Sequence, residues 1–322
     1  MESAQRFSCV LIGKGLSVRT LLQHFGSRMK NPSPAIVWFR RDLRLADNPA
    51  LDHAVRSHAE VIPVFVWAPD EESPWTPGGA SRWWLHHSLQ ALASQLAARG
   101  SRLILRQGPS GEALSRVVSE AGASAIYWNR CYEPSAISRD SQVKQQLREA
   151  GITAESFAGN LLMEPWNVKN ASGGPFQVFT PFWRTYEATA DLVCSPSPDR
   201  IHGPVRWPSI LDLTELRLLP SVNWTEGMSQ SWTPGEVGAA AVIQSFAGGN
   251  ADVYDINRDR PDLVGTSRLS PHLHFGEVSP RQAWNAVAAV PFRRQLVWRE
   301  FAHHLLFHFP RDRKSTRLNS SH

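Results

Sequence analysis

The sequence is poor in cysteine and has no long apolar run. Its three cysteines, Cys9, Cys131 and Cys194, lie far apart and form no CxxC pair. This excludes a disulfide framework and a cysteine zinc site, and it fits a reducing compartment. No apolar stretch approaches the roughly 20 residues that a membrane-spanning helix requires. With 42% hydrophobic and 20% charged residues, the chain can still bury a core. We therefore predict a cytoplasmic globular protein with no membrane partner.

Two signatures of other functions are also missing. The apolar segment Ala35–Phe39 is followed by RRDLRLADN, which contains no glycine, so the Gly-rich phosphate loop of another kind of nucleotide-binding α/β module is absent. His304 and His308 are four residues apart, a spacing that suits a metal pair, but neither an HExxH motif nor a third ligand accompanies them. We therefore predict no metal site.

The excess of basic charge is confined to the two ends of the chain. The formal net charge is +5 and the pI about 9.4, values that suggest a nucleic-acid-binding protein. However, Met1–Lys30 contains five basic residues and one acidic residue, and Arg311–His322 contains four and one, so the interval between them is slightly acidic. DNA binding must therefore be inferred from local residues and not from the pI.

Residues 35–157 alternate between short apolar runs and amphipathic segments. The apolar runs are typical of buried parallel strands, and leucines between residues 85 and 96 recur at the spacing of a helix face. Asp47 or Asn48 can cap the first helix, which Pro49 suits as a first residue. We predict strands at 35–39, 61–67, 102–106, 125–129 and 152–157, and helices from Pro49, at 81–99, at 111–121 and at 138–150. This alternation predicts an α/β fold, a doubly wound parallel five-stranded sheet with flanking helices, which binds ligands at the carboxyl ends of its strands.

After Phe157 the alternation stops. Residues 195–232 are rich in Pro, Ser and Trp, as in a long connector, and helical periodicity returns at 235–246, 279–290 and 292–309. We predict an N-terminal extension (1–34), an α/β domain (35–165), a connector (166–233), the first part of an all-α domain (234–310) and a tail (311–322). For the extension we favour a true start at Met29, with a transit peptide as the alternative. We interpret the tail, RDRKSTRLNSSH, as non-native sequence, with an ordinary solvated tail as the alternative.

The most informative stretch is GTSRLSPHLHFGEVSPRQAW (Gly265–Trp284), followed by WREF (Trp298–Phe301). Its first block places three hydroxyls and an arginine within five residues, closed by Pro271. Such a turn before a helix can hold a phosphate, because free backbone N–H groups and the helix dipole favour an anion. Taken alone, the turn is equally typical of a plain helix cap.

Together these blocks resemble the flavin-binding half of the photolyase/cryptochrome family. Three further segments resemble the same family, in the same order: IVWFRRDLRLADNPAL (Ile36–Leu51), IYWNRCYEP (Ile126–Pro134), and GNLLMEPW with PFQVFTPFWR (Gly159–Trp166, Pro175–Arg184). The resemblance covers residues 35–310 and is strongest to the bacterial cyclobutane-dimer photolyases. It implies that the α/β domain is followed by an all-α FAD-binding domain.

The resemblance implies that FAD is held in a folded form by the helical domain. Short hydroxyls donate to phosphate oxygens without bulk, and arginine offers a planar pair of donors. The positions that correspond to cofactor contacts are Tyr254, Thr266, Ser267, Arg268, Leu269, Ser270, Phe292, Gln295 and Arg299. A second, antenna chromophore (folate or deazaflavin) is a further expectation, although Pro134–Ala136 lacks the Asn-Glu pair of folate-binding members.

The resemblance also implies an activity on UV-damaged DNA. Light-excited reduced FAD donates an electron to a pyrimidine dimer, the dimer splits, and the electron returns. The dimer must leave the base stack, as in other enzymes that act on a base in DNA. The positions that correspond to substrate or DNA contacts are Arg258, Gln295, Trp298 and Glu300. No obligate protein partner is implied, and we expect a monomer.

Two departures from the family pattern keep alternatives open. Gln295 stands where members that repair cyclobutane dimers usually carry Glu, and where (6-4) photolyases and animal cryptochromes tend to carry Gln. The family also continues beyond Pro310 with helices that supply electron-relay tryptophans, so no catalytic residue is assigned and we interpret the chain as a truncated copy. Light-dependent DNA repair is the first hypothesis. A cryptochrome-type blue-light receptor and a (6-4) photolyase are the alternatives.

Overall fold

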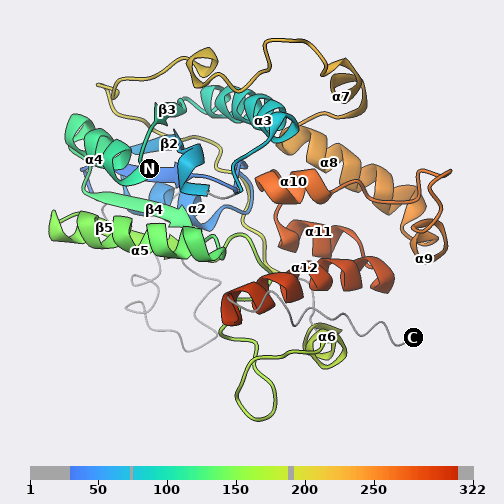
Figure 1. Cartoon of the computed structure of the whole chain (residues 1–322). Helices are drawn as coiled ribbons and strands as arrows, with labels where there is room; N and C mark the ends of the chain where they lie inside the picture. The colour runs from blue at the N-terminus through green and yellow to red at the C-terminus, as the bar shows by residue number, and fades with distance from the viewer. Residues whose placement is uncertain (1–29, 73–74, 188–191, 311–322) are drawn as a thin grey trace, which may run out of the picture.

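The computed structural model describes residues 30–72, 75–187 and 192–310, and its N-terminal part is a parallel sheet (Figure 1). Within these residues five strands pair in the order β3-β2-β1-β4-β5. The strands are β1 (Ala35–Phe39), β2 (Val61–Trp67), β3 (Ile104–Gln107), β4 (Ala125–Asn129) and β5 (Thr153–Phe157). The predicted sheet is confirmed, and β1, β2 and β4 have the predicted bounds.

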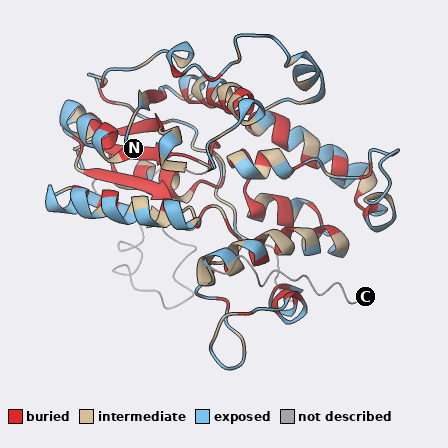
Figure 2. Ribbon diagram, in the orientation of Figure 1, coloured by how far each residue is buried: buried red, intermediate tan, exposed pale blue. Residues whose placement is uncertain are grey.

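Helices cover both faces of the sheet. They are α2 (Pro49–Ser57), α3 (Gly79–Ala98), α4 (Ser110–Ala121) and α5 (Pro134–Glu149). Because the pleat turns successive side chains to opposite faces, Val37 and Phe39 of β1 pack with α2 and α3, whereas Ile36 and Trp38 pack with α4 and α5. Strands β1, β2 and β4 are therefore buried along their whole length (Figure 2).

Capping side chains and prolines decide where the flanking helices begin. Of the two predicted caps of α2, Asn48 is the one used: its Oδ1 accepts a hydrogen bond of 3.1 Å from the Leu51 amide. Helix α5 begins at Pro134, four residues before the predicted start, because proline suits the first turn, whose amides need no partner within the helix.

The second part of the chain is helical and lies beside the sheet (Figure 1). Its helices are α6 (Phe179–Glu187), α7 (Glu226–Ser231), α8 (Glu236–Ser245), α9 (Tyr254–Asn257), α10 (Ser270–Phe275), α11 (Pro280–Ala286) and α12 (Val290–His308). Short turns add to these at Pro69–Glu72, Leu213–Leu216 and Phe246–Asn250. Helices α6, α8, α11 and α12 share one aromatic core.

Two expectations about the helical part are wrong. The helix predicted at 279–290 ends at Ala286: Val287 is extended, and a separate helix, α12, begins at Val290 with Pro291 in its first turn. Helix α6 was missed, although its core residues Phe182 and Tyr186 recur at helical spacing.

The structure does not test the predictions about the chain ends and the domain boundaries. The start at Met29, the body of the predicted extension and the tail 311–322 lie outside the described residues, and the other domain boundaries stay predictions. Asn31 belongs to the described part, and its amide donates a hydrogen bond of 2.9 Å to the Ser57 carbonyl. No described helix combines the length and the apolarity needed to cross a bilayer.

A buried arginine joins the sheet to the helical part. Arg44 follows β1, is fully buried, and donates to the carbonyls of Asp47 (2.9 Å), Gly159 (2.6 Å) and Gly276 (3.0 Å). Gly276 ends α10 with a φ of +68°, and a Cβ there would lie 2.0 Å from the Arg41 carbonyl oxygen. Only glycine allows this approach, so α10 is held directly against the segment that follows β1.

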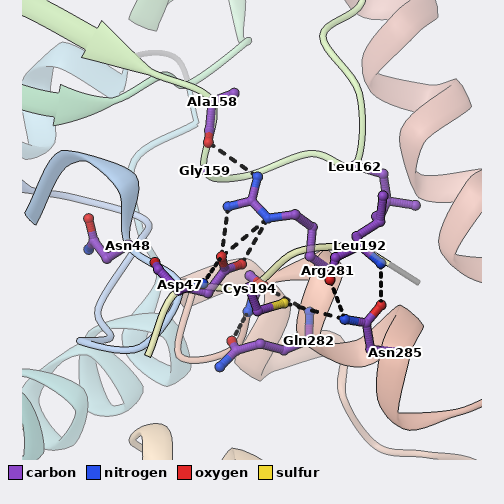
Figure 3. A network of polar contacts seen from close by, with 12 residues as sticks. Asp47, Asn48, Ala158, Gly159, Leu162, Leu192, Cys194, Arg281, Gln282 and Asn285 are labelled. Atoms are coloured by element: carbon purple, nitrogen blue, oxygen red, sulfur yellow. Dashed lines mark hydrogen bonds and ion pairs between the residues drawn. The ribbon is translucent and has the colours of Figure 1, made fainter. Parts of the chain in front are cut away.

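An ion pair strengthens the same junction (Figure 3). Arg281 of α11 donates to Asp47 at 3.0 and 3.1 Å and to the Ala158 carbonyl at 3.4 Å. Asp47 is 2% exposed and adopts a φ of +50°, which an L-residue rarely adopts without compensating contacts. The loop after β1, the exit of β5 and the start of α11 therefore form one polar junction.

We predict that Arg44→Met lowers the free energy of unfolding by about 3–5 kcal/mol, because it leaves three buried carbonyls without their charged donor. Urea unfolding measures this. Arg56→Met is the matched control, since Arg56 is 72% exposed and only pairs with Asp52 on the same helix; it should cost no more than about 0.5 kcal/mol. A loss at Arg44 as small as that of the control would contradict a dependence of the fold on this junction.

Candidate cofactor cavity and adjoining cleft

A cavity of about 520 Å³ lies between the helical part and the carboxyl edge of the sheet. Helix α12 contributes Phe292, Gln295, Leu296, Arg299 and His303 to its wall. These residues recur at steps of three and four, so one face of α12 points into the cavity. Helices α9 and α10 extend this wall, and segments after β1 and β4 form the opposite one.

Seven of the nine residues predicted to contact the cofactor line this cavity. They are Tyr254, Ser267, Leu269, Ser270, Phe292, Gln295 and Arg299. Thr266 and Arg268 are exposed and do not line it. The Arg268 guanidinium instead lies 3.9 Å from the ring centre of Trp232 and donates to the Ser231 carbonyl. Helix α10 has only six residues, so its dipole adds little and the hydroxyls carry any anion binding.

One end of the cavity is aromatic. Tyr254 and Phe292 lie edge to face with ring centres 6.0 Å apart, and Phe246 packs against both. Burial raises the pKa of the Tyr254 hydroxyl above its ordinary value, so the hydroxyl stays protonated at neutral pH. This end offers flat apolar surface and one hydrogen-bond donor.

The opposite wall carries a charged pair that the sequence analysis did not single out. Glu133 accepts from Arg41 at 2.5 Å, and Arg41 also contacts Glu72 at 3.1 Å. Burial opposes ionisation of Glu133, but the Arg41 guanidinium holds the pKa of this carboxyl below its ordinary value. Glu133 belongs to the motif IYWNRCYEP, and the acidic residue in that motif was the signal that could have identified it.

Two histidines of the cavity are uncharged at neutral pH. Burial lowers the pKa of His274 to about 4, with Arg41 adding to the effect, and burial together with Arg299 lowers that of His303 to about 4. Burial also raises the pKa of the Cys131 thiol to about 11. The positive charge of this cavity therefore comes from its arginines.

A larger cleft of about 1800 Å³ adjoins the cavity and has Trp298 in its wall. The Trp298 ring is stacked on Phe179 of α6, with centres 3.6 Å apart and planes at 7°. Arg258, another predicted DNA contact, lies 5.6 Å from the Tyr254 ring centre and lines neither the cavity nor the cleft. Gln295 lines the smaller cavity, so the predicted DNA contacts are distributed over several surfaces.

Glu300, the remaining predicted DNA contact, faces the protein interior. It is 2% exposed, and its Oε2 accepts from the Leu162 amide at 2.8 Å. Burial raises the pKa of this carboxyl to about 7, despite Arg299 at 3.5 Å. Arg299 and Glu300 both reach the segment 160–163, since Arg299 donates to the Asn160 carbonyl.

The possible metal pair forms ordinary internal contacts. His304 accepts from the Phe176 amide at 3.0 Å, and His308 lies 3.1 Å from the Pro165 carbonyl. Among the described residues, three or more metal-ligating side chains do not gather anywhere.

Comparisons with known proteins agree with the family resemblance. A family model described as DNA photolyase matches residues 35–201. A deoxyribodipyrimidine photo-lyase of Agrobacterium fabrum is 43% identical over 290 residues, which cover 86% of this chain and 60% of the relative. Cryptochrome-1 of Arabidopsis thaliana is 38% identical over 275 residues, covering 82% and 38%.

Solved structures of such proteins have the same fold. A bacterial class III photolyase from Agrobacterium tumefaciens superimposes with a TM-score of 0.82 at 43% identity, covering 87% of this chain and 60% of that structure. An archaeal photolyase from Sulfolobus tokodaii superimposes with a TM-score of 0.71 at 27% identity, covering 86% and 60%. The chain thus spans about three fifths of the length of these photolyases.

We predict that Glu300→Gln gains stability relative to the wild type as the pH rises. The pKa of the carboxyl is 4.5 in the unfolded chain and about 7 in the folded protein. Between these two pH values the folded state binds more protons than the unfolded state, so wild-type stability falls as the pH rises. The shift corresponds to about 2–3 kcal/mol between pH 5 and pH 8. Glutamine keeps the acceptor for the Leu162 amide and has no such dependence.

Urea unfolding of both proteins at the two pH values measures the effect. Glu112→Gln is the control, because Glu112 is 66% exposed and its difference from the wild type should not change with pH. A constant difference between Glu300→Gln and the wild type would show that the carboxyl is ionised when buried.

Proposed function

The chain belongs to the DNA photolyase family, and we propose that it serves the light-driven splitting of cyclobutane pyrimidine dimers in UV-damaged DNA, with reduced FAD as electron donor. The observation that carries this proposal is the cavity in which α9, the loop before α10, and α12 bring seven predicted cofactor residues together. We further propose a monomer located in the cytoplasm, with no obligate protein partner.

The residues of the cavity fit FAD. Its volume of about 520 Å³ lies in the ordinary range for cofactor sites, roughly 300–1,000 Å³. One polar atom of a lining residue, His303 Nδ1, is buried without a hydrogen-bond partner among the described residues, so it is available to a ligand. Ser267 and Ser270 would hold the phosphates, and Tyr254 and Phe292 would contact flat apolar parts. When bound, light-excited reduced FAD supplies the electron that opens the dimer.

The charge distribution suits an anionic cofactor. Arg41 and Arg299 provide positive charge, whereas His274 and His303 are neutral and add none. Gln295 presents a donor and an acceptor without a charge, so it can hydrogen-bond a base edge or the cofactor. The two arginines therefore stabilise negative charge on a bound cofactor, and Gln295 adds a polar contact without adding charge.

Helix α12 borders the proposed sites of both ligands, the cofactor and the DNA. Gln295 and Trp298 are three residues apart and lie on adjoining faces, one toward the cavity and one toward the cleft. We propose that Trp298 stacks on the extruded dimer and that Arg258 contacts the DNA backbone, which positions DNA without reading its sequence. For Glu300 we propose an indirect role, because its carboxyl is engaged by the Leu162 amide.

A cryptochrome-type receptor or a (6-4) photolyase is the second candidate, and Gln295 is the residue that favours it. A photo-lyase at 43% identity, against 38% for a plant cryptochrome, supports the dimer-repair proposal more strongly. The same fold and flavin site would serve all three.

We also propose a second chromophore, a folate or a deazaflavin, at the carboxyl edge of the sheet. Trp38 Nε1 and Arg40 Nε are buried there without a partner among the described residues, and Arg40 and Arg139 lie 4.4 and 5.3 Å from the Trp38 ring centre. The relative from Sulfolobus tokodaii is described with two FAD molecules, so a second chromophore has a precedent in this fold.

The activity is tested with the purified protein and photoreduced FAD. An oligonucleotide with one cyclobutane thymine dimer should be repaired in blue light and not in the dark, and one with a (6-4) product should not be repaired. Repair of the (6-4) product alone, or bound flavin without any repair, would replace the proposal by one of the two alternatives. Absence of flavin binding would contradict all three.

We predict that Ser267→Ala weakens FAD binding about tenfold or more, because a hydrogen bond to a charged phosphate is lost. Thr266→Ala is the matched control: its hydroxyl is next in the chain but exposed and outside the cavity, and its effect should stay within about twofold. Quenching of flavin fluorescence measures both affinities. Equal losses would contradict the assignment of the phosphates to the cavity wall.

A further inference from the structure

Three side chains from two helices form one stack at the wall of the larger cleft. Phe179, the first residue of α6, lies face to face with Trp298 of α12 at 3.6 Å. The guanidinium of Arg294, one turn before Trp298, lies 5.7 Å from the Phe179 ring centre. All three border the cleft of about 1800 Å³.

The stack restricts the Trp298 ring. Phe179 covers one ring face, and Phe301 packs edge-on against both rings, at 5.9 Å from Trp298 and 5.7 Å from Phe179. A ring held on one face and one side has little rotamer freedom left, so little entropy remains to be lost when a ligand is bound. Phe179 itself is 6% exposed and Arg294 is exposed, so Phe179 links a surface cation to Trp298.

We propose that Phe179, supported by Arg294, is the positioning residue that orients Trp298 for an extruded pyrimidine dimer. This inference rests on the proposed function, since it assigns a support to the ring that would stack on the substrate. Phe179 does not touch the dimer. Its contribution is selective binding of damaged over undamaged duplex DNA, because an extruded dimer reaches the Trp298 ring whereas bases that stay in the stack do not.

If Phe179 only packed against Trp298 in the core, its truncation would have a different effect on DNA binding, and Phe182 provides the comparison. Phe182 lies on the same helix, is 1% exposed, and contacts Phe301 and Tyr186. If α6 served packing alone, truncation of Phe179 and of Phe182 would lower stability and leave the selectivity of DNA binding unchanged in both.

The test compares binding of a duplex oligonucleotide carrying one cyclobutane thymine dimer with binding of the same undamaged duplex oligonucleotide, at one salt concentration. We expect Phe179→Leu to lower the ratio of the two affinities about three- to tenfold, the range of an aromatic pair, while FAD affinity is unchanged. Phe179→Tyr should restore the ratio, because it keeps the ring. Phe182→Leu should lose thermal stability but keep the ratio.

A surface variant covers the case in which Phe179→Leu does not fold. Arg294→Ala should lower the affinity for both oligonucleotides and, in addition, the ratio by about twofold, whereas Arg294→Lys should keep the ratio. A wild-type protein without selectivity would refute the proposed function itself. Wild-type selectivity that persists in Phe179→Leu, or in Arg294→Ala when that is the variant that folds, would overturn this inference alone.

Discussion

The buried guanidinium of Arg44 makes the hydrogen bonds on which the rest of the architecture depends. It donates to carbonyls of three segments that are more than one hundred residues apart in the chain, at Asp47, Gly159 and Gly276. Burial lowers the pKa of Arg44, and a charge in such a place is tolerated only where each donor finds an oxygen. The loop after β1, the exit of the sheet and the end of α10 must therefore meet in a single geometry.

The position of the candidate cavity follows from that junction. Because α10 ends against the loop after β1, Ser267 before it and Ser270 at its start line the same cavity as the Arg41–Glu133 pair on the sheet side. Neither wall alone would enclose a ligand. The helical wall supplies hydroxyls and aromatic rings, and the sheet wall supplies an arginine whose charge Glu133 and Glu72 partly balance. Neutral imidazoles of His274 and His303 complete the lining without adding to that charge.

Helix α12 shows how neighbouring residues acquire different roles. Gln295 and Arg299 are four apart and line the cavity, Trp298 borders the cleft, and Glu300 turns to the core and holds the Leu162 amide. A helix advances about 100° per residue, so the adjacent residues of the WREF motif point into three different environments: the cleft, the cavity and the core. The aromatic ring of Phe179 adds a support from α6, a helix that packs on α12 from a distant part of the sequence.

The sequence by itself determined the parallel sheet and most of its helices. Apolar runs and the leucine spacing indicate which residues are buried, and burial largely decides whether a segment forms a strand or a helix. It also predicted nine positions as cofactor contacts, and seven of them line one cavity. Only the tertiary structure decided that Arg268 turns to Trp232, that Glu300 faces inward, and that Arg41 and Glu133 form the other wall. These outcomes depend on contacts between segments distant in the chain, and periodicity within one segment carries no information about its partners.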